Sequence, residues 1–337
     1  MNAGWVLRRR PHGAIQSADL ELIESPLAAL GDDQILVRNV YLSIDPTNRV
    51  WMSDREQYLP PVGVGEVVRG ITVGVVEDST SSRFAPGDTV LLGDGGWQRY
   101  SMSDAAAATR IRRRDGIPLT ASLSVLGTTG LTAYTGLLDI CRPHPGETLV
   151  VSAAAGAVGS IVGQIGKIMG CRVVGIAGGP EKCRWIVEEL GFDGAVDYTS
   201  EDVGDALDRL CPDGIDMDFE NVGGAIMDAV YARMNRHGRM AVCGLISSYN
   251  SNGPMAGPTD FGRVLMQRLT IQGFVVLDHF DRARDAYADL ASWIQAGRLR
   301  WKDYVLDGIE AAPEALSLLF TGKHDGKIMV RIADERS

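Results

Sequence analysis

The chain has 337 residues, a length at which two domains of about 150 residues each are expected. Charged residues make up 23% and hydrophobic residues 45%, with 40 glycines and 14 prolines, which excludes disordered, collagen-like and coiled-coil chains. The 33 Lys and Arg residues against 43 Asp and Glu residues give a net charge of -10, which opposes binding to nucleic acid or to anionic membranes.

Cysteine usage and the N-terminal residues indicate the compartment. The five cysteines are an odd number without a C-x-x-C pair, so we interpret them as reduced thiols. Three arginines, Arg8, Arg9 and Arg10, are followed by no apolar segment or small-residue cleavage site, so no signal peptide is predicted. No stretch of about 18 uncharged apolar residues occurs. We therefore expect a cytoplasmic protein that does not span a membrane.

The first third of the chain has the pattern of β-structure. Residues 35–44, 70–77 and 88–92 form alternating or apolar runs with Pro-Gly, Gly-Asp and Gly-Gly between them, which predicts a small barrel or sandwich. The run at residues 327–332 near the C-terminus is also strand-like, and we expect it to return to this first domain.

From about Thr148, short apolar runs alternate with helical periods, as in βαβ units with a parallel sheet. Glycine or proline ends most of the helical segments. The number of runs matches the six strands of a doubly wound sheet. The runs lie at residues 148–152, 172–177, 194–198, 215–220, 239–243 and 270–276, and the helices at 159–169, 181–190, 202–210 and 224–235.

The segment Val150 to Gly159 ends one run and opens the next helix, where a dinucleotide fingerprint belongs. It reads G-x-G-x-x-G with Ala154 in the first glycine position, followed by Gly156 and Gly159. Gly156 lets a pyrophosphate approach backbone amides at a helix N-terminus, and Gly159 allows close contact between helix and sheet. The alternative is a purely structural tight turn, but the βαβ context favours cofactor binding.

The end of the second run indicates which dinucleotide binds. An acidic residue there would bind the ribose hydroxyls of NAD, but this chain has Ala177-Gly178-Gly179-Pro180. Lys182 and Arg184 follow at the start of the next helix and suit a 2′-phosphate. We therefore predict NADP, with a solvated helix face as the alternative interpretation of the two cations.

Sequence blocks spread over nearly the whole chain carry a family resemblance. They are Asp45-Pro46 with Arg49, Tyr58-Leu-Pro-Pro61, Gly95-Gly-Trp-Gln98, Gly130 to Leu137, Ala153 to Gly159, Glu181-Lys182, Gly191-Phe192, Asp197-Tyr198, Glu220 to Gly224, Cys243-Gly244, Tyr249-Asn250, Gly273 to Val276 and Gly326-Lys327. In these blocks the chain resembles the zinc-independent medium-chain dehydrogenase/reductases, in particular the group of prostaglandin, alkenal double-bond and curcumin reductases.

This resemblance implies an α/β fold in which a Rossmann domain with a doubly wound six-stranded parallel sheet joins a GroES-like, mainly β catalytic domain. It places the catalytic and substrate domain at residues 1–124, the NADP-binding domain at 125–302, and a C-terminal return to the catalytic domain at 303–337. A homodimer formed through the cofactor domain is also implied.

The resemblance and the fingerprint together assign site residues. Tyr249 is expected beside the substrate carbonyl, with Tyr58 as a second phenol at the mouth of the site. Lys182 and Tyr198 would contact the 2′-phosphate, and Phe274 and Val276 the nicotinamide. The predicted cofactor-binding residues are Thr132, Ala154, Gly156, Ala157, Val158, Gly159, Gly178, Lys182, Tyr198, Asn221, Cys243, Gly244, Tyr249, Phe274, Val276 and His324.

Two positions depart from the family pattern. His324 stands where the family usually has an Asn that contacts the cofactor, which puts that contact in doubt. The family segment Asp-Pro-Tyr-Met-Arg is here Asp45-Pro46-Thr47-Asn48-Arg49, which suggests an altered substrate pocket.

No zinc site is expected, since neither the catalytic Cys, His and carboxylate ligands nor a four-cysteine lobe is present. Hydride addition to an activated C=C bond needs only stabilisation of a developing enolate, so we predict an NADPH-dependent reductase of small α,β-unsaturated ketones or aldehydes. Tyr249 or a water would supply the proton; alternatively, Tyr249 only shapes the pocket. Two other functions stay open: a zeta-crystallin-type quinone reductase, and an NADPH-binding sensor without turnover.

Overall fold

The structure is a computed structural model that describes residues 1–113, 115–251 and 253–335. The chain divides into two compact units: Met1–Leu123 together with the C-terminal segment from Asp303 form unit 1, and Ser124–Lys302 form unit 2. Residue 114 of the predicted catalytic domain and residues 336–337 of the predicted C-terminal segment lie outside the described residues. In the described part of the chain, no helix is long and apolar enough to cross a membrane.

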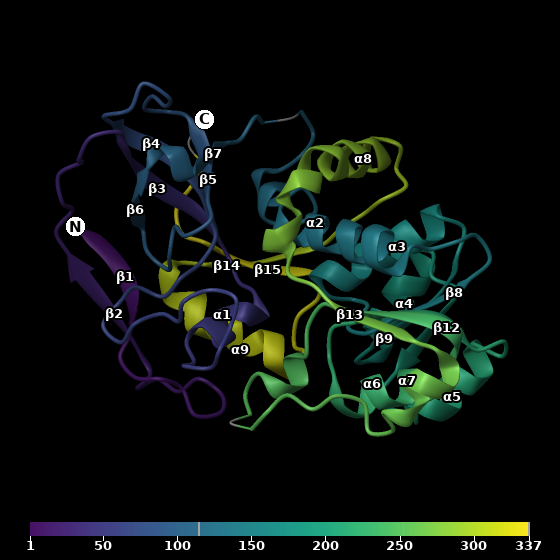
Figure 1. Ribbon diagram of the computed structural model, residues 1–337. Helices are drawn as coiled ribbons and strands as arrows, with labels where there is room; N and C mark the ends of the chain where they lie inside the picture. Colours follow the sequence, from purple (N-terminus) through teal and green to yellow (C-terminus); the bar gives the residue numbers. More distant parts are fainter. Residues whose placement is uncertain (114, 252, 336–337) are drawn as a thin grey trace. The chain divides into compact units, whose positions relative to one another are not determined.

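Unit 1 is mainly β (Figure 1). Strands β1 (Asn2–Leu7) and β2 (Leu20–Ser25) form an antiparallel hairpin. A larger sheet of the described residues has the order β14-β15-β3-β4-β5-β7, with β6 pairing β3. Its strands are β3 (Gln34–Ser43), β4 (Thr72–Ser79), β5 (Thr89–Leu92), β6 (Tyr100–Asp104), β7 (Ala108–Arg110), β14 (Asp303–Asp307) and β15 (Lys327–Arg331), and its helices are α1 (Pro46–Trp51), η1 (Ala105–Ala107), η2 (Leu119–Leu123), η6 (Ile309–Ala311) and α9 (Ala312–Thr321).

The C-terminal strand β15 completes unit 1. It pairs antiparallel with β3, with Met329 opposite Ser43. At the start of β15, the buried Lys327 ammonium donates to the carbonyl oxygen of Ile44 at 3.0 Å and forms an ion pair with Asp45. Asp45 is the N-cap of α1 in a capping box with Asn48, whose side-chain oxygen accepts from the Asp45 amide at 2.7 Å. The last strand therefore fixes the start of α1.

Unit 2 is a parallel sheet flanked by helices. Its strands have the order β10-β9-β8-β11-β12-β13 within the described residues, and every neighbouring pair is parallel. This is the 3-2-1-4-5-6 order of a Rossmann sheet, whose order reverses between β8 and β11. The strands are β8 (Thr148–Val151), β9 (Arg172–Ala177), β10 (Gly194–Asp197), β11 (Ile215–Glu220), β12 (Met234–Val242) and β13 (Thr270–Gly273).

The helices of unit 2 alternate with these strands. Apolar residues of β8, β9 and β10, among them Val150, Val174 and Val196, pack with Leu207 of α5 and Val230 of α6 in one buried cluster. The helices are α2 (Thr128–Thr135), the π-helix η3 (Gly136–Cys141), α3 (Ala157–Ile168), α4 (Pro180–Glu188), α5 (Val203–Leu210), α6 (Gly224–Tyr231), η4 (Ile246–Ser248), α7 (Gly262–Gln267), η5 (Val276–Arg282) and α8 (Ala283–Gln295).

The predicted fold class is confirmed: a doubly wound parallel sheet and a separate mainly β domain. The strand boundary that differs most from the prediction is the start of β12, which begins at Met234 and not at Arg239. The register between β11 and β12 shifts after Ile215, and His237 there has a φ of 65°. This irregularity interrupts the apolar pattern in the sequence without ending the strand.

Candidate cofactor-binding and active site

The first feature of the site is the turn between β8 and α3, at the point where the strand order reverses. Ala153 adopts a φ of 49°, and Gly156 is the N-cap of α3. A Cβ atom at Gly159 would lie 2.5 Å from the carbonyl oxygen of Ala153, so only glycine lets the helix pass the turn so closely. Ala157 and Val158 open the helix, where first-turn amides lack intrahelical acceptors and attract an anion. The structure therefore brings the fingerprint residues together at the start of α3.

The second feature joins the ends of β8 and β11. The Ser152 hydroxyl donates to Glu220 Oε1 at 2.9 Å and accepts from the Asn221 amide at 2.7 Å. The Asn221 side-chain amide donates to the carbonyl oxygen of Ser152 at 2.7 Å. Asn221, a predicted cofactor residue, is thus fixed beside the fingerprint turn.

Ser152 and Glu220 were given no role by sequence reasoning. The signal available was an acidic residue at the end of an apolar run, directly before Asn221-Val-Gly-Gly. Burial raises the pKa of Glu220, although hydrogen bonds from the Gly223 and Val222 amides and from Ser152 partly offset this effect. Neighbouring Asp218 is also fully buried, and burial together with Glu220 raises the pKa of Asp218 well above its usual range.

The third feature lies where β9 and β10 end. A Cβ atom at Gly178 would lie 2.8 Å from the Tyr198 hydroxyl oxygen, so the exposed phenol covers this glycine. Asp197 accepts from the Gly179 amide at 2.8 Å and from the Thr199 hydroxyl at 2.6 Å. Burial opposes but does not outweigh these hydrogen bonds, which lower the pKa of Asp197. Lys182 lies in the first turn of α4, which follows β9 and precedes β10.

The loop after β12 holds the predicted catalytic phenol. Tyr249 follows the short helix η4, and its hydroxyl oxygen accepts from the Leu245 amide at 3.1 Å. A Cβ atom at Gly244 would lie 3.2 Å from that oxygen and 3.4 Å from the carbonyl oxygen of Asn221. The structure therefore brings Tyr249, Gly244 and Asn221 together. Burial and the Glu220 carboxylate raise the pKa of the preceding Cys243 thiol to about 12, which keeps it neutral.

Phe274 and Val276 follow β13, which is an edge strand among the described residues. The ring of Phe274 packs edge-on against Phe219, with centroids 6.1 Å apart, and a Cβ atom at Gly136 would lie 2.4 Å from it. Because this ring points into the domain, a contact of Phe274 with the cofactor would come from its main chain. The Thr132 hydroxyl donates to the carbonyl oxygen of Thr128 at 2.7 Å within α2, which leaves its oxygen as an acceptor.

Two predicted residues belong to unit 1. Tyr58 lines a hollow of about 570 Å³ formed by residues 54–61, and its hydroxyl is hydrogen-bonded to the hydroxyl of Thr47. Thr47 is one of the departures from the family pattern, so this contact depends on a residue particular to this chain. His324 Nδ1 donates to the carbonyl oxygen of Leu318 at 3.1 Å, at the end of α9. The roles of Tyr58 and His324 stay predictions.

Comparisons with known proteins agree with this geometry. Family models match residues 3–111, described as the N-terminal domain of oxidoreductase, and residues 157–296, described as zinc-binding dehydrogenase. The chain is 44% identical over 339 residues to the NADPH-dependent curcumin reductase of Escherichia coli, covering 99% of this chain and 98% of that one. It belongs to the medium-chain dehydrogenase/reductase family. The resemblance predicted from the sequence is confirmed.

Two further relatives lie in the same group of the family. The NADP(+)-dependent 2-alkenal reductase of Nicotiana tabacum is 39% identical over 308 residues, covering 90% of this chain and 89% of that one. The crystal structure of CurA from Vibrio vulnificus in complex with NADPH matches with a TM-score of 0.93 and 41% identity, covering 99% of this chain and 100% of that one.

The description of the second family model names zinc. Within residues 1–113, 115–251 and 253–335, no group of three or more His, Cys, Asp or Glu side chains is arranged to hold a metal ion. The described cysteines are free, and burial raises the pKa of Cys141 to about 12. A neutral thiol is a poor metal ligand.

Proposed function

We propose that this protein is an NADPH-dependent reductase of the C=C bond of α,β-unsaturated ketones or aldehydes. The observation that carries the proposal is the placement of the Tyr249 hydroxyl against Gly244 and Asn221, beside the fingerprint turn of a Rossmann domain. The named relatives in the same family group reduce curcumin and 2-alkenals with NADPH, which supports the same class of reaction here.

The residues at the strand ends fit NADP(H). The close approach of Gly159 to the Ala153 carbonyl oxygen leaves the start of α3 open to a pyrophosphate. Gly178, Lys182 and Tyr198 would hold the 2′-phosphate, because this position has a cation and a phenol where an NAD site has a carboxylate. Asn221, Cys243 and Gly244 would line the groove, and the main chain at Phe274 and Val276 would hold the nicotinamide.

When bound, NADPH supplies a hydride to the β-carbon of the substrate. Tyr249 is proposed to hydrogen-bond the substrate carbonyl oxygen and to deliver the proton, directly or through a water. The Leu245 amide donates to the Tyr249 oxygen and thereby holds this oxygen beside Gly244. Tyr58 is proposed as a second phenol that binds substrate, held by the Thr47 hydroxyl.

The two units would have different functions in this reaction. We propose that residues 125–302 form the NADP-binding domain and that residues 1–124 with 303–337 form the catalytic and substrate domain. We also propose that the protein is cytoplasmic. His324 would replace the Asn contact of the family, with an imidazole N–H that already donates to Leu318.

A homodimer through the cofactor domain is also proposed. Strand β13 is an edge strand within the described residues, pairing with β12 only. The neighbouring segment before and within α7 leaves Phe261, Leu265 and Met266 between 63% and 72% exposed. An unpaired edge beside exposed apolar side chains favours pairing with a second copy. Light scattering after size exclusion should give twice the chain mass; a monomer mass would contradict this part.

The test is NADPH oxidation, followed by nicotinamide absorbance, with a panel of enones, enals and quinones, and with NADH in parallel. Oxidation with an enone and recovery of the saturated ketone supports the proposal. Turnover of quinones alone would indicate the zeta-crystallin-type quinone reductase instead. Tight NADPH binding without oxidation by any acceptor would indicate a sensor without turnover.

A further inference from the structure

Glu220 is a carboxylate with no solvent exposure at the end of the central strand β11. Its Oε1 accepts from the Ser152 hydroxyl at 2.9 Å, from the Gly223 amide at 2.8 Å and from the Val222 amide. Its Oε2 is buried without a hydrogen-bond partner among the described residues. Burying a carboxylate costs free energy that an apolar side chain would not, so its retention here calls for a role beyond packing.

The carboxylate fixes the turn that follows β11. Gly223 and Gly224 in this turn have φ values of 79° and 60°, a conformation that glycine tolerates and that the Glu220 hydrogen bonds hold in place. This turn also holds the loop that follows β12. The carbonyl oxygen of Val222 accepts from the Ser247 amide at 3.0 Å and from its hydroxyl at 2.6 Å, and that of Asn221 accepts from the Ile246 amide at 3.2 Å.

The same loop ends in Tyr249. The Tyr249 amide donates to the carbonyl oxygen of Ile246 at 3.2 Å, and its hydroxyl oxygen accepts from the Leu245 amide. Both the main chain and the phenol of Tyr249 are therefore bonded to residues of a loop that the Asn221–Val222 carbonyl groups hold. A continuous series of hydrogen bonds leads from the buried carboxylate to the phenol.

We infer that Glu220 is a positioning residue for Tyr249, acting through the main chain of Asn221 and Val222 and through Ile246 and Ser247. This inference rests on the proposed function, since Tyr249 matters only if its phenol takes part in the reaction. Ser152 belongs to the same network, because its hydroxyl bridges Glu220 Oε1 and the Asn221 amide.

The first test is a double-mutant cycle of Glu220→Leu and Tyr249→Phe, measured as kcat at saturating NADPH and enone. Glu220→Leu removes the oxygen that accepts from Ser152, Val222 and Gly223, and we expect kcat to fall about 10- to 100-fold, since small misplacements have effects of this size. In the Tyr249→Phe background the same substitution should change kcat by less than about twofold, because coupled residues are not additive. Full additivity would overturn the proposal.

The second test does not depend on turnover. Hydrogen exchange of the free protein reports the Ile246 and Ser247 amides, which donate to the turn that Glu220 holds. Glu220→Leu should raise their exchange rates about 10-fold or more, and Ser152→Ala should do the same if the first variant folds poorly. Unchanged exchange in both variants would overturn the proposal, whatever their stability.

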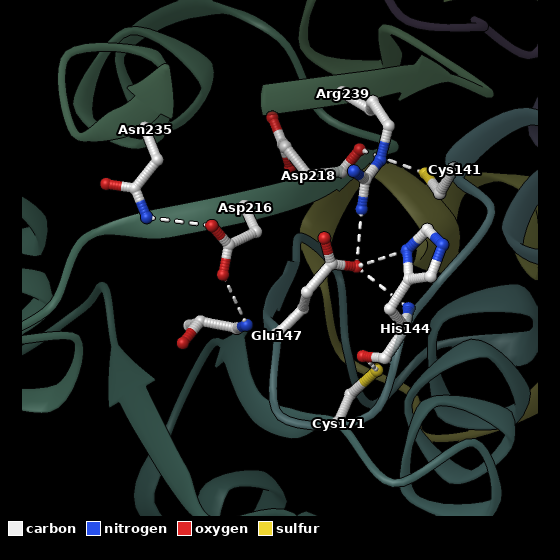
Figure 2. Close-up of polar contacts among 9 residues, drawn as sticks. Cys141, His144, Glu147, Cys171, Asp216, Asp218, Asn235 and Arg239 are labelled. Carbon is white, nitrogen blue, oxygen red and sulfur yellow. Dashed lines mark hydrogen bonds and ion pairs between the residues drawn. The ribbon is translucent and has the colours of Figure 1, made fainter. Parts of the chain in front are cut away.

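Glu147→Leu is the matched control (Figure 2). Glu147 precedes β8 at the opposite, amino edge of the same sheet, where it accepts from Arg239 at 2.5 Å and from the His144 amide at 2.8 Å. Its replacement breaks an ion pair without touching the β12 loop, so kcat and the exchange at residues 246–247 should stay at wild-type values. Equal changes in this control would show a general loss of stability and overturn the proposal.

Different results would contradict the proposed function and the positioning role of Glu220. A wild-type protein that oxidises no NADPH with any enone contradicts the proposed function, and the exchange measurement then still decides whether Glu220 holds the loop. A wild-type protein that reduces enones while Glu220→Leu changes neither kcat nor exchange contradicts only the role of Glu220.

Discussion

The phenol oxygen of Tyr249 accepts a hydrogen bond from the main-chain amide of Leu245 at 3.1 Å. A neutral phenol that accepts one bond still has its own proton to donate. The Leu245 amide thereby fixes the position of the phenol oxygen beside Gly244.

Replacing Tyr249 by Phe removes the proton donor and leaves the ring. We expect kcat for an enone to fall about 100-fold, within the usual range for general acid catalysis, while the Kd for NADPH changes less than about threefold. Steady-state kinetics and fluorescence titration measure the two quantities. Tyr304→Phe, at an exposed tyrosine of β14, is the control and should behave as wild type. An unchanged kcat in Tyr249→Phe would remove the phenol from the mechanism.

Lys182 should decide between the two nicotinamide dinucleotides. Loss of a charged hydrogen bond to the 2′-phosphate costs about 1.5–3 kcal/mol, so Lys182→Ala should weaken NADPH binding about 10- to 100-fold and leave NADH binding unchanged. Titration with each dinucleotide measures this difference. Arg184→Ala, two residues along α4 and on another helix face, should have a smaller effect. Equal weakening of both dinucleotides would argue against a phosphate contact at Lys182.

Gly159 should tolerate no side chain. The Cβ atom of Gly159→Ala would meet the Ala153 carbonyl oxygen at 2.5 Å, which forces a shift of backbone. We expect the free energy of unfolding to drop by about 1–3 kcal/mol and NADPH binding to weaken. Gly93→Ala is the control, because no atom lies within 4 Å of its added Cβ atom. Denaturant titration measures both variants, and equal stabilities would contradict the close approach.

Asp218 predicts a pH dependence of stability. Both of its carboxylate oxygens are buried without a hydrogen-bond partner among the described residues, and burial, then Glu220, raises its pKa well above the usual range. An unfolded Asp titrates near pH 3.9, so folding takes up a proton above that pH. The stabilising contribution is therefore complete below about pH 4 and is lost as the pH rises toward the folded-state pKa.

Asp218→Asn removes the titrating carboxyl group and, with it, this pH dependence of stability. We expect the Tm of the variant to exceed that of the wild type at pH 8 by a few degrees, where about 1 kcal/mol corresponds to roughly 2–4 °C, and by less at pH 5. Thermal melts at the two pH values measure the difference. A difference in Tm between variant and wild type that is equal at both pH values, or larger at pH 5, would show that Asp218 is ionised in the folded protein.

The sequence predicted the parts of the fold that local pattern determines. Short apolar runs between helical periods predicted the parallel sheet, and the glycine spacing at Ala154 to Gly159 predicted the turn that opens α3. In β12 the pattern predicted only the second half, because His237 at positive φ interrupts it while the strand continues. Local pattern carries no information about such register shifts.

The site was only partly predictable. Family blocks indicated Tyr249, Asn221 and Gly244, which the structure brings together. The role of Glu220 depends on Ser152, which lies 68 residues earlier in the chain, so no local spacing could reveal it. The contact between Thr47 and Tyr58 arises at a position where the chain departs from its family, so the resemblance could not supply it either.

Hydride transfer to the β-carbon of an enone is the defining step of the proposed reaction. The most direct measurement uses NADPH deuterated at the transferable position of the nicotinamide, followed by NMR of the product of a simple α,β-unsaturated ketone. We expect a saturated ketone with deuterium on the β-carbon. An allylic alcohol with deuterium on the carbonyl carbon, or no product while NADPH is bound, would contradict it.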